Sequence, residues 1–94
     1  MQVETSPPIE YGRQSAHMEI RFTCAGCPMQ FEGSVGDEFF YFRARYETYW
    51  CGFGSTLEAA IRDSQKNEGG YIDDTDFKKC FKKLGKLLAK RYGW

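Results

Sequence analysis

Apolar and polar side chains alternate with a period of two through residues 17–54, which is typical of β-strands that bury one face. Four runs carry this alternation, and each is short enough to be one strand. Their apolar positions are Ile20, Phe22 and Cys24; Met29 and Phe31; Phe40, Phe42, Ala44 and Tyr46; and Tyr49, Cys51 and Phe53. The pattern therefore predicts four consecutive strands between about residues 17 and 54.

Three two-residue turns are predicted to join these strands, at residues 25–26, 36–37 and 47–48. With these turns every inward-facing apolar residue lies opposite another one. The expected pairs are Phe22–Met29, Ile20–Phe31, Phe31–Phe42, Met29–Ala44, Ala44–Cys51 and Phe42–Phe53. The outward rows are then Arg21–Gln30–Arg43 and Glu32–Tyr41, with Arg45 facing Trp50. Because a slip of one residue would exchange the two faces, this sorting predicts an antiparallel meander.

Two helices are predicted after the strands, over about residues 55–68 and 74–92. Ser55 and Glu58 form a capping box at the start of the first helix, and Gly69 and Gly70 end it. The second helix has apolar residues three and four positions apart and lysines on its other side. We expect an α+β domain over residues 17–94, with both helices packed on the single apolar face of the sheet. Residues 1–16, which show no period, are expected to form a flexible N-terminal tail.

The 94 residues allow one domain, and 13 basic against 13 acidic side chains leave the molecule without net charge. This balance argues against a general polyanion binder. The charges are nevertheless uneven, because residues 1–69 hold six basic and ten acidic side chains and residues 70–94 hold seven and three. The basic end is either a solvated helix face docked on an acidic body or a basic binding strip. Without an apolar run of membrane-spanning length or a signal-peptide pattern, we expect a soluble cytoplasmic protein that does not bind membranes.

Four cysteines raise the question of a metal site. Cys24 and Cys27 have the spacing of half a zinc knuckle, and Cys51 and Cys80 also fall on inward positions. A zinc-stabilised structural module is therefore one alternative. The sequence has no second pair of this spacing, so reduced thiols packed as small apolar groups are favoured over zinc or a disulfide.

Catalytic patterns are weak in this chain. His17 is the only histidine, and no serine or cysteine is placed to pair with it. Glu19 and Glu32 face each other in the expected register, but the flanking arginines make them ion-pair partners. No glycine-rich phosphate loop is present. We therefore predict a protein that is not an enzyme and needs no cofactor.

The outward face of the predicted sheet is the main candidate contact surface. It carries arginine, tyrosine and tryptophan, the residue types enriched in interface hot spots. Its candidate residues are Arg21, Gln30, Tyr41, Arg43, Arg45 and Trp50, and the lysine side of the last helix adds Lys78, Lys82 and Lys86. A solvated face with its own ion pairs, a protein partner, and single-stranded nucleic acid stacked on the rings are the three alternatives.

One stretch resembles a known group of sequences. Cys27-Pro28-Met29-Gln30, Glu32-Gly33, the segment from Phe40 to Arg45 and then Trp50 resemble a pattern in small proteins of phages, prophages and their hosts. The resemblance covers residues 24–54 and carries no known active site. It implies a phage-encoded inhibitor that binds and blocks a host defence complex, as anti-CRISPR proteins do, with a CRISPR effector as the expected type of partner.

Overall fold

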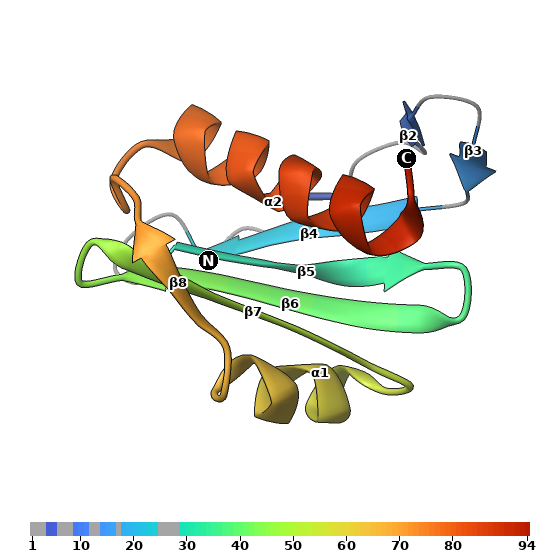
Figure 1. Cartoon of the computed structure of the whole chain (residues 1–94), viewed down its shortest axis with the longest axis horizontal. Helices are drawn as coiled ribbons and strands as arrows, with labels where there is room; N and C mark the ends of the chain where they lie inside the picture. Colours follow the sequence, from blue (N-terminus) through green and yellow to red (C-terminus); the bar gives the residue numbers. More distant parts are fainter. Residues whose placement is uncertain (1–3, 6–8, 12–13, 17, 25–28) are drawn as a thin grey trace.

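The computed structural model describes residues 4–5, 9–11, 14–16, 18–24 and 29–94, and the side chains from residue 29 onward. A six-stranded antiparallel sheet forms the centre, in the order β1-β4-β5-β6-β7-β8 (Figure 1). Its strands are β1 (Glu4–Thr5), β4 (Met18–Cys24), β5 (Met29–Val35), β6 (Glu38–Arg45), β7 (Thr48–Gly54) and β8 (Glu68–Tyr71). The short strands β2 (Ile9–Tyr11) and β3 (Gln14–Ala16) pair separately. The expected α+β fold with a four-stranded meander is confirmed in β4 to β7.

Helix α2 (Phe77–Tyr92) covers the apolar face of the sheet (Figure 1). Phe31 and Phe42, on neighbouring strands, are fully buried, and so are Leu84 and Leu88 of the helix. The ring of Phe31 lies 5.7 Å from that of Phe81 between the ring centroids. The helix begins at Asp76, whose carboxylate accepts a hydrogen bond from the Lys79 amide at 3.1 Å. The period-two pattern of the strands and the three-and-four pattern of α2 therefore meet in one core.

Helix α1 (Leu57–Ser64) lies on the opposite face of the sheet, so the expectation that both helices share one face is wrong (Figure 1). Gly52 and Gly54 of β7 point away from the core, and α1 packs directly over them. A Cβ atom added at Gly52 would overlap the α1 backbone, and one at Gly54 would lie 2.6 Å from the Cβ of Ala59. Two outward positions without side chains thus let a helix come close to the backbone of β7, which a search for apolar positions does not register.

The register confirms the second predicted turn and corrects the other two. Phe31 pairs with Phe42, as expected. Phe22 pairs with Phe31 instead of Met29, and Phe42 pairs with Cys51 instead of Phe53. Each correction is a shift of two residues, so in the regular part of each ladder inward positions still pair with inward positions. The exception is Cys24, which lies beyond an irregularity in β4 and pairs with Gln30, an outward position.

The third turn shows why its position was wrong. Tyr46 and Glu47 both have positive φ angles, of 57° and 60°, and form the turn one residue earlier than predicted. A primed hairpin turn needs this backbone, and glycine or asparagine is its usual signal. Here Tyr46 and Glu47 adopt this backbone, so the residue types at the turn do not indicate its position.

Strand β8 replaces what the sequence predicted as the end of the first helix and a loop. Gly69 lies in this strand directly under the ring of Tyr49, and a side chain at this position would overlap that ring. The Thr48 hydroxyl donates to the Gly69 carbonyl at 2.9 Å. Helix α1 is correspondingly short, and Thr56 rather than Ser55 caps it by accepting from the Ala59 amide at 3.1 Å. Neither helix in the part of the chain described is long and apolar enough to cross a membrane.

Candidate functional site

The outward face of the sheet is less open than the sequence predicted, because α1 covers part of it. Tyr41 lies opposite Gly52, over which α1 packs, and is only 8% exposed. Burial accordingly raises the pKa of the Tyr41 hydroxyl. Gln30 lies opposite Arg43 and is half-buried. The backbone of Arg21 lies in β4 opposite Glu32, while its side chain is outside the described part of the chain.

The arginines of this face lie against aromatic rings. Arg43 pairs across the strands with Trp50, and its guanidinium carbon lies 5.8 Å from the ring centroid. Arg45 does not face Trp50, as predicted, because the register is shifted by two; it lies 4.7 Å from the ring of Tyr46. The Nε atoms of Arg43 and Arg45 are buried without a hydrogen-bond partner. Both side chains are half-buried, and their Nε atoms are closed to a partner.

A more exposed surface is formed by α2, which carries seven basic side chains and no acidic one. We call its lysines the lysine face: Lys78, Lys79, Lys82, Lys83, Lys86 and Lys90. All of them except the half-buried Lys83 are exposed, and within the described part of the chain none forms an ion pair with an acidic side chain. The predicted contact residues on this helix, Lys78, Lys82 and Lys86, therefore all face solvent.

Arg91 differs from the lysines because it is used within the fold. It donates two hydrogen bonds of 2.7 Å to the Glu38 carboxylate, which also accepts one of 2.8 Å from the Tyr92 hydroxyl. These bonds to Arg91 lower the pKa of Glu38. They tie the end of α2 to the start of β6.

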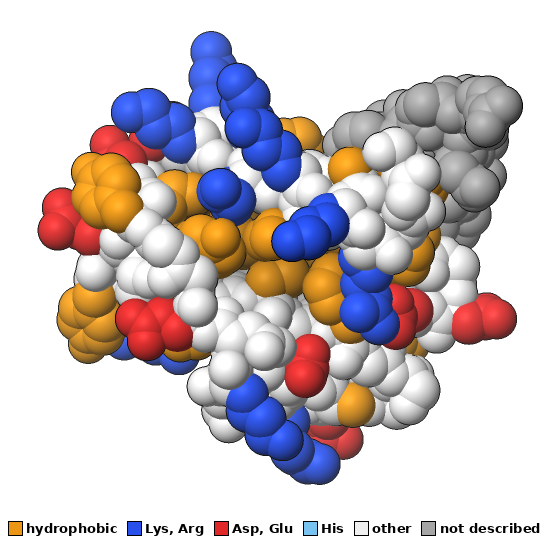
Figure 2. Space-filling model, in the orientation of Figure 1, with side chains coloured by type: hydrophobic (Ala, Val, Ile, Leu, Met, Phe, Trp, Pro, Cys, Tyr) orange, Lys and Arg blue, Asp and Glu red, His pale blue; other side chains and the backbone are white. Residues whose placement is uncertain are grey.

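The charges of the chain are separated along the sequence and in space. Residues 29–76 carry ten acidic and four basic side chains, whereas residues 77–94 carry seven basic and none acidic. Figure 2 shows the Lys and Arg side chains gathered along α2, with apolar side chains exposed directly beneath them. The positive surface of this neutral protein is thus concentrated on one helix.

A narrow hollow of about 270 Å³ lies between β8 and the lysine face. Its walls are Tyr71, Ile72, Asp73, Lys79, Lys82, Lys83 and Lys86. Tyr71 is 74% exposed, so its ring is available to a ligand. Asp73 is held in place by the Thr75 hydroxyl, which donates to it at 2.6 Å and lowers its pKa. Four ammonium groups against one carboxylate make this hollow strongly basic.

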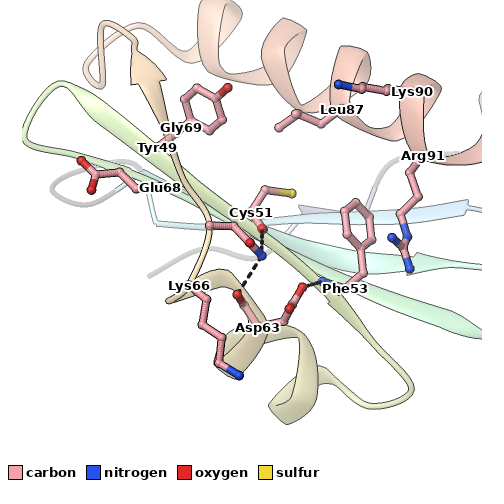
Figure 3. Close-up of a pocket in the computed structure, with 11 residues that line it drawn as sticks. Tyr49, Cys51, Phe53, Asp63, Lys66, Glu68, Gly69, Leu87, Lys90 and Arg91 are labelled. Carbon is pink, nitrogen blue, oxygen red and sulfur yellow. Dashed lines mark hydrogen bonds between the residues drawn. The ribbon is translucent and has the colours of Figure 1, made fainter.

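A wide hollow of about 790 Å³ lies farther along α2 (Figure 3). Its floor is apolar and consists of Tyr49, Cys51, Phe53 and Leu87. Its rim consists of Asp63, Lys66, Asn67, Glu68, Gly69, Lys90 and Arg91. The sequence placed the floor residues in the core and so missed this hollow. The missing information was the glycine-guided position of α1, because α1 and β8 build the wall opposite α2.

Beside the wide hollow, side chains form hydrogen bonds with the backbone amide and carbonyl groups of β7. β8 pairs with β7 at Thr48 and Trp50, and among the described residues no strand pairs with the rest of that edge. Asp63 accepts from the Phe53 amide at 3.0 Å, and Asn67 donates to the Cys51 carbonyl at 3.2 Å (Figure 3). A ligand in the wide hollow would therefore be held by side chains and not by addition of a strand to β7.

The described thiols lie in the hydrophobic core. Burial raises the pKa of Cys51 to about 12 and that of Cys80 to about 11, so both are protonated at neutral pH. A thiolate is the form that attacks carbonyls and binds metals. Cys27 lies outside the described residues, and Cys24 is described only as the end of β4. Among the residues that the structure describes, no three His, Cys, Asp or Glu side chains are grouped to hold a metal ion.

Comparison of the chain with protein-family models, curated proteins and solved structures found no match. Two surfaces of the molecule combine exposure with distinctive chemistry: the lysine face and the pair of hollows beside it.

Proposed function

We propose that this protein is a non-catalytic binding module that docks on an acidic surface of a partner protein through the lysine face. The separation of charge carries the proposal: α2 holds seven basic side chains and residues 29–76 hold an excess of six acidic ones. Opposite charges on two proteins speed their encounter and select the correct partner.

The size of α2 suits this role. A helix of 16 residues is about 24 Å long, and a specific interface buries about 800 Å² on each side. The outer side of α2 together with its neighbouring hollows offers a surface on this scale. Arg43 and Trp50, half-buried on the other face, are a second and smaller contact candidate.

The resemblance of residues 24–54 to small phage and prophage proteins supports a more specific form of the proposal. In this form the protein acts in the cytoplasm of a host cell as a phage-encoded inhibitor. It blocks a defence complex such as a CRISPR effector by covering an acidic surface on it. Such blocking requires only affinity and bulk, which a small domain can supply without catalysis.

The experiment combines a binding assay and an infection assay. Purified chain is tested for binding to purified CRISPR effector complexes, and cells expressing the chain are infected with a phage that their CRISPR system targets. We expect binding, restored plaque formation, and a loss of about tenfold in affinity for Lys82→Glu. Arg62→Glu, an equal charge reversal at an exposed position of α1, is the matched control and should bind normally.

Two results would contradict the proposal at different levels. Equal binding by Lys82→Glu and Arg62→Glu would remove the lysine face as the contact surface. If the wild-type chain binds none of the effector complexes and does not restore plaque formation, the protein is not an inhibitor of these complexes.

Single-stranded nucleic acid is the second candidate partner, because the exposed Tyr71 ring lies beside four lysines. Asp73 in the narrow hollow and Glu68 in the wide one oppose a polyanion. A labelled oligothymidylate distinguishes the two, because binding that falls steeply with salt would favour nucleic acid.

A further inference from the structure

We infer that the narrow and the wide hollow form one docking groove for an extended peptide segment of the partner, in which an acidic cluster stands about three residues from a large apolar anchor. This inference rests on the proposed function and adds the chemistry of the segment that the lysine face recognises. It depends on the position of the hollows, on the charge of each and on their separation.

Both hollows lie along α2. The helix lines the narrow one with residues between Lys79 and Lys86, and the wide one with Leu87, Lys90 and Arg91. The opposite wall of both comes from β8, through Tyr71 in the narrow hollow and Gly69 in the wide one. Figure 2 shows exposed apolar side chains continuing beneath the basic row of α2. One extended ligand can therefore lie along the helix and contact both hollows.

The narrow hollow suits carboxylates. Four lysines and one aspartate line it, and that aspartate is already bonded to Thr75. Lysine stems pack along apolar surface while their ammonium groups stay in water, so they can follow small changes in ligand position. Clustered glutamate or aspartate side chains meet the charge of this hollow, and Tyr71 and Ile72 contact their aliphatic parts.

The wide hollow suits an apolar side chain. Its two acids and three bases nearly cancel, and two of these groups are already engaged: Arg91 by Glu38, and Asp63 by the Phe53 amide. In Figure 3 the side chains of Lys66 and Glu68 point away from its centre, while Lys90 lies above Leu87. The floor at the centre consists of two rings, a thiol and a leucine; the Arg91 guanidinium lies 4.3 Å from the centroid of the Phe53 ring and the Lys83 ammonium 5.5 Å from that of Tyr49. A tryptophan, phenylalanine or leucine of the partner would bury apolar surface here.

The different character of the two hollows favours a peptide over a nucleic acid. A polynucleotide carries a charge at every residue, so it would place phosphates over the nearly neutral wide hollow as well as over the basic narrow one. A peptide can place its charges and its apolar anchor separately. The groove therefore suits a peptide segment that carries its negative charges at one end and an apolar side chain at the other.

The separation of the hollows sets the spacing in the ligand. The lysines of the narrow hollow are centred near residue 82, and the α2 residues of the wide one near residue 89. At about 1.5 Å per residue these centres lie about 10 Å apart along the helix. An extended peptide covers that distance with about three residues.

The test uses a fluorescein-labelled synthetic peptide of four glutamates, two small spacer residues and one tryptophan, and measures its fluorescence anisotropy with the full chain. We expect replacement of the tryptophan by serine, or of the glutamates by glutamines, to weaken binding about tenfold each. A peptide with eight spacer residues, which moves the anchor beyond the wide hollow, should lose most of the contribution of the tryptophan.

Variants of the protein locate the peptide. Lys82→Glu should abolish the preference for glutamates, whereas Lys78→Glu, the same change at an exposed lysine that lines neither hollow, should have a much smaller effect. Lys90→Trp should fill the wide hollow and remove the advantage of the tryptophan peptide over the serine peptide. Lys90→Gln, which removes the charge without filling the space, should keep that advantage. Circular dichroism confirms that each variant is folded.

The outcomes separate this inference from the proposed function. Equal binding of the tryptophan and serine peptides, with dependence on Lys82 retained, would overturn the groove and leave the lysine face in place. Equal loss from Lys78→Glu and Lys82→Glu would also overturn the groove, because charge alone would then decide. Tighter binding of an oligothymidylate than of the peptide would overturn both proposals.

Discussion

The two faces of the sheet are covered by helices that pack in different ways. On the inner face large side chains of the strands, such as Phe31 and Phe42, fill the space beneath α2. On the outer face α1 lies directly on the backbone of β7 at Gly52 and Gly54. Large buried side chains therefore hold α2 on the inner face, whereas the lack of side chains at Gly52 and Gly54 allows α1 to pack on the outer face.

This difference matters for the candidate site. The wide hollow opens beside β7, between α2 on the inner side of the sheet and the end of α1 on the outer side. The wall formed by α2 is positioned by the core beneath that helix, and the wall formed by the end of α1 is positioned by Gly52 and Gly54. Changes in either packing mode should alter both stability and the shape of the groove.

The largest expected effect is on the inner face. Leu84→Ala removes a fully buried side chain from the core and should lower the free energy of unfolding by about 2–5 kcal/mol, because a cavity remains. Urea denaturation followed by tryptophan fluorescence measures the loss. Lys86→Ala, two residues along α2 and exposed, is the control; an equal loss there would contradict the assignment of the core.

On the outer face, Gly52→Ala should lower the free energy of unfolding by about 1–3 kcal/mol, because the new Cβ would overlap the backbone of α1. Gly70→Ala is the matched control, since a Cβ at that position meets nothing within 4 Å. The same denaturation experiment serves both variants. A neutral Gly52→Ala would show that α1 does not pack on β7.

The smallest expected effect concerns the tie between α2 and β6. Arg91 lowers the pKa of Glu38 from its ordinary value of 4.5, so this carboxylate stabilises the fold above that pH and loses the contribution as the pH falls below it. Both side chains are partly exposed, so the contribution should be below about 1 kcal/mol. In Glu38→Gln the melting temperature should fall less steeply below pH 4.5 than in the wild type. Asp37→Asn, at the adjacent exposed turn position, should retain the wild-type slope.

The inner face could be predicted from the sequence because side-chain parity survives errors in register. Two of the three predicted turns are wrong, but each error displaces a strand by two residues, so Phe22 still pairs with an inward residue, Phe31, and Cys51 with Phe42. The outer face could not be predicted in the same way. Gly52 and Gly54 have no side chain to enter the pattern, so the helix that covers them had no visible partner in the sequence.

The candidate site was predicted only in part. The lysine face follows from the spacing of the lysines on an amphipathic helix, and its exposure agrees with that prediction. The hollows beside it depend on β8, whose Gly69 and Gly70 are typical of a helix end when only the sequence is considered. They depend also on residues that are distant in sequence, such as Tyr49 and Leu87, which only the fold brings together.

Two side chains form hydrogen bonds with the edge of β7 that β8 does not cover, and this affects how the protein behaves at high concentration. Unpaired amides and carbonyls at the margin of a sheet are templates for joining another sheet, and such joining leads to fibrils. Asp63 and Asn67 use the exposed groups of Phe53 and Cys51 before a second molecule can. The charge on Asp63 also repels an approaching strand that carries acidic residues. This stretch of the chain should therefore resist cross-β assembly even when the protein is made in large amounts.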